Sequence, residues 1–157
     1  TVSLVDFFAT AAAIVDADVP DDAAEDSFDL LPAMLGTDNE VPIRETTIHH
    51  SASGCFAIRK GDWKLLIHQG SGGNKYDDFT DMSPVQLYQI GEDEGEDRNV
   101  YKAHPDVVKE LAEDFMKIVD DGRSRPGGVQ SNYDDENRWG QVKDAVEALS
   151  DVGVSVS

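Results

Sequence analysis

The chain has 157 residues, enough for one domain with a modest hydrophobic core. Its 32 acidic residues outnumber its 13 basic ones and give a net charge of −19, which disfavours binding to nucleic acid or to anionic membranes. No apolar run is long enough to span a bilayer. The single cysteine excludes a disulfide within the chain.

The first predicted element is a helix over residues 4–15, with Ser3 as N-cap and Asp6 in the position of a capping box. Almost every other residue of this helix is apolar, so it has hardly any polar face. A helix that is apolar all round needs to be buried on all sides, and a short acidic chain offers little surface for that. We expect the helix to dock on a further domain, and the isolated chain to self-associate through it.

An acidic connection follows at residues 16–26. It lacks the glycine and the glutamate that an EF-hand loop has at its sixth and twelfth positions, so we interpret it as a solvated loop. An acidic calcium-binding protein remains an alternative, and it would require saturable calcium uptake. Residues 27–35 predict a short helical turn that ends at Gly36.

Residues 43–68 carry four basic and only two acidic residues, a local net charge of +2 that would steer an anionic ligand toward them. The runs 56–60 and 63–67 are rich in β-branched, aromatic and aliphatic residues. They are separated by two residues, Gly61 and Asp62, which is typical of a tight β-hairpin. An extended run at 43–49 precedes them and predicts a further strand.

Beyond the hairpin, a loop rich in Gly, Ser and Asp is predicted over 69–84 and a fourth short strand over 85–90. Pro105 begins an amphipathic helix that ends at Gly122. After it, Arg123 and Arg125 are expected to offset two aspartates at the helix C-terminus, and a last amphipathic helix is expected between Trp139 and Leu149. The pattern predicts an α+β fold: a four-stranded antiparallel sheet packed by the helix from Pro105, with an N-terminal helix that docks elsewhere.

Three stretches in order are similar to one known family: IHHSASGCFAIRKGDWKLLI (48–67), QLYQIGEDEGEDRNVYKAHPDVVKEL (86–111) and DGRSRPGG (121–128). Together they resemble the C-terminal subdomain of arylsulfatase-like, formylglycine-dependent sulfatases. The resemblance implies that residues 1–36 lead in from a missing α/β catalytic domain, that 37–126 form the subdomain, and that 127–157 form a tail.

The resemblance further implies a chain that shapes the substrate pocket of an enzyme hydrolysing sulfate esters with formylglycine and a calcium ion. It implies a periplasmic or secreted location, and a sulfated small molecule or polysaccharide as substrate. The family's nucleophile motif and calcium ligands have no counterpart here, so we expect the isolated chain to be inactive. A stand-alone binding or interaction module without catalysis is the alternative. An upstream reading frame that contains a C-x-P-S-R motif would favour the sulfatase.

Cys55 and Arg59 formally fit the C-x-[P/A]-x-R pattern in which sulfatases make formylglycine. The modified cysteine of the family heads a helix amid metal-binding carboxylates, whereas Cys55 is predicted to open a strand. The L-x-T-G continuation is missing as well. We therefore interpret the match as coincidence and expect Cys55 to act as a small apolar residue.

His49, His50 and Ser51 are the candidate substrate-binding residues. The two histidines would face opposite sides of an extended run, which disfavours joint zinc binding. Their ordinary role would be a hydrogen bond at a strand end, but the resemblance implies that one of them points toward the sulfate ester site. Ser51 has no general base arranged for it, so a serine hydrolase is disfavoured. Arg59 and Lys64 rank second, because such residues more often pair with carboxylates.

Overall fold

The computed structural model describes residues 1–37, 42–51, 54–70, 83–131 and 143–155. The chain divides into two compact units. One comprises Thr1–Thr47 with Lys117–Asn132, and the other comprises Ile48–Met116 with Tyr133–Ser157. The predicted loop at 69–84 lies mostly outside the described residues.

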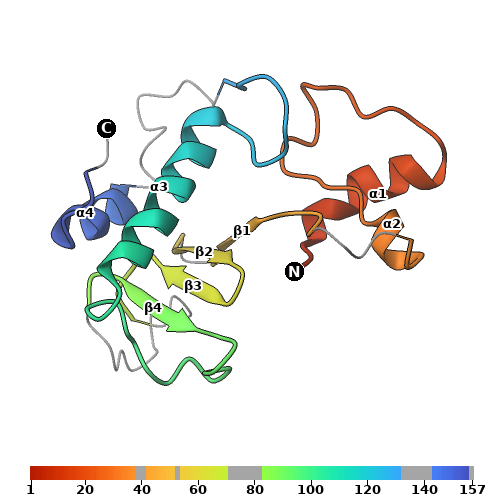
Figure 1. Ribbon diagram of the computed structural model, residues 1–157. Coiled ribbons are helices and arrows are strands. Elements are labelled where there is room, and N and C mark those ends of the chain that lie inside the picture. The colour runs from red at the N-terminus through yellow and green to blue at the C-terminus, as the bar shows by residue number, and fades with distance from the viewer. Residues whose placement is uncertain (38–41, 52–53, 71–82, 132–142, 156–157) are drawn as a thin grey trace. The chain divides into compact units, whose positions relative to one another are not determined.

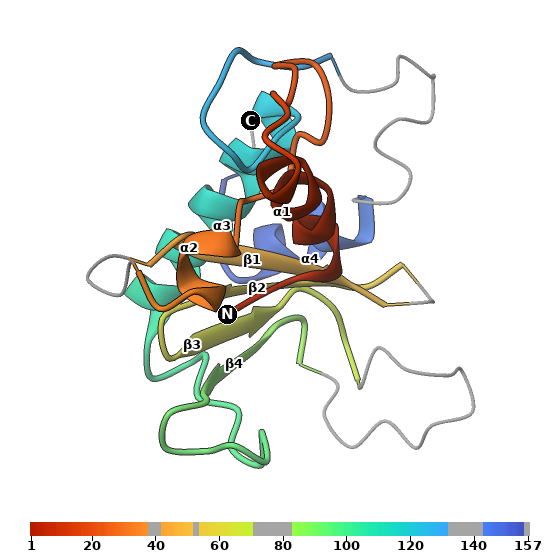
Figure 2. The same ribbon diagram turned by 90° about the vertical axis from the view of Figure 1, so that its right-hand side faces the viewer.

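The chain forms the four-stranded antiparallel sheet that the sequence predicts, and all of it except the first two residues of β1 belongs to the second unit. The strand order is β1-β2-β3-β4. The strands are β1 (Thr46–His50), β2 (Phe56–Lys60), β3 (Trp63–Leu66) and β4 (Gln86–Gln89), which lie side by side in Figure 2. Lys60 pairs with Trp63, so Gly61 and Asp62 alone form the turn. Gly61 has a φ of +56°, a backbone conformation that glycine adopts at little cost.

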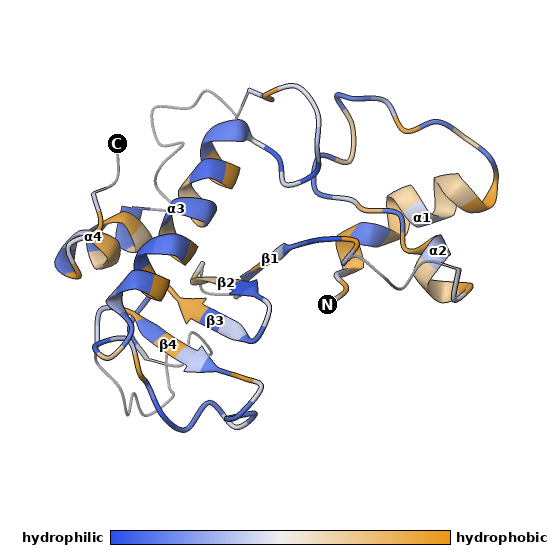
Figure 3. Ribbon diagram, viewed as in Figure 1, coloured by the Kyte–Doolittle hydropathy of each residue, from blue (hydrophilic) through white to orange (hydrophobic). Residues whose placement is uncertain are grey.

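Helix α3 (Pro105–Asp121) covers one face of this sheet (Figure 1). The ring of Phe56 lies 5.4 Å from that of Phe115, which is fully buried. Alternation along β2 places Ile58 on the same face, and it is fully buried too. Lys60 ends the row with Nζ contacts of 2.8 Å to both Glu110 and Asp114 of the helix. The helix predicted from Pro105 is therefore confirmed as the cover of the sheet, and Figure 3 shows its apolar stripe.

Helix α4 (Lys143–Asp151) completes the second unit. It buries Ala145, Ala148 and Leu149, which recur at helical spacing. The last helix predicted from the sequence is thus confirmed from Lys143 onward, whereas Trp139 lies outside the described residues.

The first unit contains the 3₁₀ turn η1 (Leu4–Asp6), α1 (Phe7–Ile14) and the short helix α2 (Leu31–Met34). The predicted capping box is present, since the backbone N–H of Ser3 donates to Asp6 Oδ2 at 2.8 Å. Most of the apolar surface in this region is exposed: Phe7 is 70% and Phe8 57% accessible. Figure 3 shows the apolar character of both α-helices. None of the helices in the described segments is long and apolar enough to cross a membrane.

A buried ion pair joins the two ends of the N-terminal segment. Asp6 is fully buried and its Oδ1 accepts from Arg44 Nη2, whose side chain is 4% exposed. Arg44 also donates to the carbonyl of Asp26 at 3.0 Å and lies over the ring of Phe28, 4.5 Å from its centroid. Sequence reasoning assigned Asp6 to the capping box alone and counted Arg44 among the cations available to a ligand. In the structure the two charges neutralise each other in a buried ion pair.

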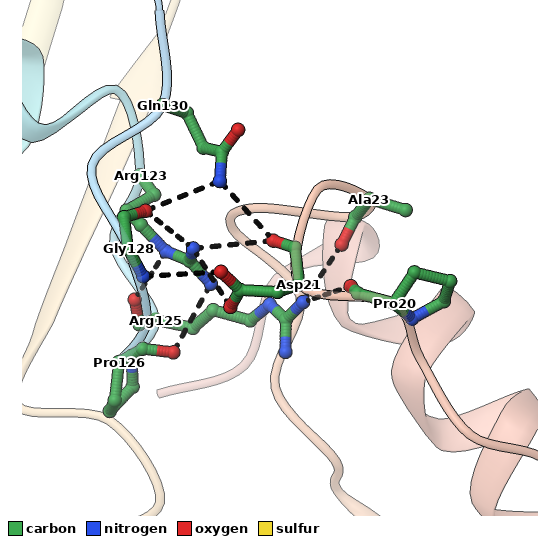
Figure 4. Close-up of polar contacts among 8 residues, drawn as sticks. All are labelled: Pro20, Asp21, Ala23, Arg123, Arg125, Pro126, Gly128 and Gln130. Carbon is green, nitrogen blue, oxygen red and sulfur yellow. Dashed lines mark hydrogen bonds and ion pairs between the residues drawn. The ribbon is translucent and has the colours of Figure 1, made fainter.

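The loop after α3 is pinned to the acidic connection near residue 21 (Figure 4). Arg123 Nη1 lies 3.1 Å from Asp21 Oδ1 and donates to the carbonyl of Gly128 at 2.7 Å, while Arg125 donates to the carbonyl of Pro20 at 2.6 Å. The N–H of Gly128 and the charge of Arg123 lower the pKa of Asp21. The expectation that these arginines offset the aspartates ending α3 was wrong for Arg123, because its side chain is almost buried among these partners.

We predict that Arg44→Met lowers the free energy of unfolding of the first unit by about 3–5 kcal/mol, because Asp6 is left as a buried charge without its partner. Native-state hydrogen exchange of the α1 amides measures this loss. Adding Asp6→Asn removes the stranded charge and should restore part of the stability. A double variant no more stable than Arg44→Met would contradict this account.

Candidate functional site

A concave pocket of about 650 Å³ opens on the face of the sheet opposite α3. It lies wholly in the second unit. Three histidines, two basic residues, two glutamates and several small or apolar residues line it: His49, His50, Ser51, Cys55, Ala57, Arg59, Lys64, Leu66, His68, Ile90, Glu94 and Glu96.

Strand alternation determines which side chains reach the pocket. Ala57 and Arg59 of β2 point away from α3, and their partners on β3 are Leu66 and Lys64. Ala57 and Leu66 are 8% and 7% exposed, and they form a buried cluster with Tyr88 of β4. The pocket therefore has an apolar floor with two cations beside each other above it.

A hydrogen-bond chain supports this floor. The hydroxyl of Tyr88 donates to Gln86 Oε1 at 2.7 Å, and Gln86 Nε2 donates to the carbonyl of Gly70 at 2.6 Å. Gln86 is 4% exposed, so these bonds satisfy its otherwise costly buried amide. The floor is held in place by polar contacts as well as by packing.

The three residues predicted to bind substrate lie together at the rim. Both histidines border the pocket, although alternation along β1 predicts that they face opposite sides of the strand. The turn is closed by Ser51, whose N–H donates to the carbonyl of Cys55 at 2.9 Å and whose Oγ accepts from Cys55 N–H at 3.1 Å. The ring of His50 lies 5.0 Å from that of Phe56.

The acidic loop between β4 and α3 holds one of the two cations. Lys64 Nζ lies 2.5 Å from Glu96 Oε1, and Glu96 has a φ of +56°. The carboxylate of Asp93 accepts backbone N–H bonds from Arg98 at 2.9 Å and Asp97 at 3.1 Å. These two bonds lower the pKa of Asp93. Asp93 thus fixes the loop that brings Glu96 to Lys64.

The basic residues of segment 43–68 differ in how they are paired. Arg44 is buried against Asp6, Lys60 bridges two carboxylates that raise its pKa, and Lys64 is paired with Glu96. Arg59 differs: its Nε donates to the carbonyl of Gly61 at 3.2 Å, and it has no ion pair within the part of the chain that the structure describes. The expectation that Arg59 and Lys64 pair with carboxylates is met by Lys64.

Cys55 lies immediately before β2, half-buried, as the sequence predicts. It heads a strand rather than a helix. No cluster of three or more His, Cys, Asp or Glu side chains that could hold a metal ion occurs among the described residues.

Comparison with known proteins identifies relatives of this chain. The chain is 36% identical over 116 residues to the N-acetylgalactosamine-6-O-sulfatase of Bacteroides thetaiotaomicron, and the match covers 71% of this chain. This chain is a sulfatase-like C-terminal region. It spans only 22% of the length of that relative. No family model matches the chain.

Two solved structures resemble the sulfatase-like region. A sulfatase described with the metabolism of multiple glycosaminoglycans by Bacteroides thetaiotaomicron shares 34% identity and a TM-score of 0.58, covering 72% of this chain and 24% of its own. Ps i-CgsB in complex with k-i-k-neocarrahexaose shares 20% identity and a TM-score of 0.55, covering 96% of this chain and 30% of its own. The second likeness concerns the fold alone.

Sequence reasoning missed part of the pocket wall in this sulfatase-like region. It did not place His68, Glu94 or Glu96 beside the candidate residues. The pairing of Arg59 with Lys64 could have been predicted from the sequence, because a two-residue turn fixes the strand register and side chains alternate between faces with a period of two. The approach of the acidic loop to the pocket could not have been predicted, because it depends on the path of the chain after β4.

We predict that the acidic loop loosens in acid. The pKa of Asp93 lies below its ordinary value of 3.8, so its stabilising effect is complete above that value and is lost as pH falls through the lowered pKa. Amide chemical shifts of Asp97 and Arg98 followed against pH should show this transition. The variant Asp93→Ala should have shifted amides already at pH 7. Glu92→Gln, an exposed change in the same loop, should behave like wild type; a transition in wild type that survives in Asp93→Ala would contradict the assignment.

Proposed function

We propose that this chain is the substrate-shaping C-terminal part of a sulfatase that hydrolyses sulfate esters of an amino-sugar polysaccharide. The 36% identity to an N-acetylgalactosamine-6-O-sulfatase carries the proposal. The pocket supports it, because histidine and arginine side chains above an apolar floor suit the sulfate groups and the carbon faces of a sugar. In this proposal residues 1–36 lead in from the catalytic domain, 37–126 form the subdomain and 127–157 a tail.

The rest of the enzyme would supply the reaction centre. A formylglycine nucleophile and a calcium ion would provide covalent attack and charge neutralisation at the sulfate. This chain would contribute the pocket wall, where His49 or His50 would donate to the ester or to a neighbouring sugar oxygen and Ser51 would hold the turn and contact the sugar. The exposed apolar face of α1, with Phe7 and Phe8, would pack on the catalytic domain.

The bacterial relative also supports a secreted or periplasmic location. Polysaccharides are too large to enter a cell intact, so an enzyme that acts on them would work outside the cytoplasm. We include this location in the proposal.

We predict that the isolated chain has no sulfatase activity, even when it is coexpressed with the formylglycine-generating machinery. The described residues contain no metal-ligand cluster, and without the cation the charge on the sulfate oxygens is not neutralised during attack. Hydrolysis of an aryl sulfate by the purified chain is the measurement. Turnover that is abolished by Cys55→Ala would contradict the prediction and identify Cys55 as the nucleophile.

The second prediction concerns the rim histidines in the full-length enzyme. If one of them contacts the bound ester, its replacement by Ala removes a charge-assisted hydrogen bond of roughly 1.5–3 kcal/mol. We expect kcat/KM to fall by about tenfold to more than a hundredfold for that variant. The melting temperature should stay near that of wild type, because both side chains are exposed and fill no core volume.

Kinetics and melting must be measured for both His49→Ala and His50→Ala. A lower melting temperature with normal kinetics in the remaining folded enzyme would indicate a structural role. Normal kinetics in both variants would remove the pair from the substrate site.

A further inference from the structure

We propose that Arg59 binds an anionic group of the saccharide other than the ester that is cleaved, namely a carboxylate or a second sulfate. The identity of the ligand rests on the proposed function. The anion site itself rests on how the charges of the pocket are arranged.

Arg59 differs from its basic neighbours in having a guanidinium that forms no ion pair with any described residue. Lys64, its partner across β2 and β3, is neutralised by Glu96 at 2.5 Å. Lys60, the next residue along β2, points to the other face and contacts Glu110 and Asp114. Within the described chain, a carbonyl is the one polar partner found for Arg59, through Nε. Arg59 lines the pocket, and its two terminal nitrogens have no hydrogen-bond partner among the described residues.

The chemistry of the group favours an oxyanion. A guanidinium presents parallel N–H donors at a spacing that fits the two oxygens of a carboxylate or sulfate, and such paired bonds are among the strongest polar contacts in proteins. Arg59 is only partly exposed and stands beside Ala57 and Leu66, which are nearly buried. An anion bound at Arg59 would have this apolar surface beside it, and a charge-assisted contact is stronger there than one that is surrounded by water on all sides.

The charges around Arg59 favour an anion at its guanidinium. Glu94 and Glu96 also line the pocket. Glu96 offsets Lys64, and neither glutamate lies within ion-pair distance of Arg59 among the described contacts. Among the described residues of the lining, Arg59 thus has no ion pair and lies near carboxylates, an arrangement that favours a ligand with its acidic group at one end.

A polysaccharide with acidic sugars matches this arrangement. Glycosaminoglycans, whose metabolism is named with the solved relative at 34% identity, have acidic sugars next to amino sugars. A sulfated amino sugar in the reaction centre would then place a neighbouring carboxylate or sulfate against a more distant wall. The pocket of about 650 Å³ is large enough for such a neighbour.

The test is a titration of the ¹⁵N-labelled chain with a disaccharide of a hexuronic acid and 6-O-sulfated N-acetylgalactosamine, followed through the amides of the pocket. We expect Arg59→Gln to weaken binding by about tenfold to a hundredfold, as for loss of a charge-assisted contact. Arg59→Lys keeps the charge but loses the paired donors and should be intermediate. Lys109→Gln makes the same change of charge on the exposed side of α3 and should bind like wild type.

Modified ligands identify the group that is bound. If Arg59 contacts the carboxylate, a carboxyl-reduced disaccharide should bind wild type and Arg59→Gln equally. If it contacts a second sulfate, a disaccharide with an added 4-O-sulfate should bind wild type more tightly than Arg59→Gln even after carboxyl reduction. Equality seen only when the 6-O-sulfate is removed would mean that Arg59 contacts the ester that is cleaved, and would overturn the proposal. A variant that had unfolded would have a lower affinity for every ligand. A loss of affinity that depends on one chemical group of the ligand therefore distinguishes recognition by Arg59 from unfolding. Equal affinity of wild type and Arg59→Gln for every ligand would overturn the proposal.

Inorganic sulfate separates this inference from the function on which it rests. Sulfate that perturbs the pocket through Arg59, with no binding of either saccharide, would contradict the proposed substrate and keep the anion site. Saccharide binding that is unchanged in Arg59→Gln would support the proposed substrate class and show that Arg59 does not bind the anion. If none of the probes perturbs the pocket of the wild-type chain, the anion site is wrong.

Discussion

The packing of the β2–β3 hairpin against α3 determines the rest of the second unit. Phe56, Ile58 and Leu65 must face the helix, since only there can their apolar surface be buried beside Phe115. Strand geometry then sends the alternate residues, including Arg59 and Lys64, to the opposite face. The pocket is thus a direct consequence of how the core is made. A shift of one residue in register would exchange the two sets.

Most of the basic residues in the candidate segment serve the fold of this very acidic chain. Arg44 neutralises a fully buried aspartate, and Lys60 ties the sheet to α3 through two carboxylates. The net charge of this segment therefore overstates the positive charge that is available to bind a ligand. What matters is whether a given cation keeps donors that the fold does not use, and on that criterion Arg59 stands apart.

The first unit presents the opposite situation, an apolar surface that the described chain leaves exposed. Phe7 and Phe8 are more than half accessible, while the polar residues Asp6 and Thr10 of the same segment are buried. The helix thus buries its polar side against the loop that leads to α2, where Thr10 Oγ1 accepts from the N–H of Leu30. Its apolar side is oriented outward. This inversion agrees with a chain that spans only 22% of its sulfatase relative.

The sequence by itself determined the strands, the two-residue turn at Gly61, the helix from Pro105 and the sulfatase likeness, because periodicity, turn residues and ordered motifs are local properties. The candidate rim residues were also readable, although their role stays a proposal. Only the tertiary structure decided how the charges are paired. Asp6 forms an ion pair with Arg44, Asp21 with Arg123 and Glu96 with Lys64. These partners are far apart along the chain, and residue spacing holds no information about which distant charges the fold brings together.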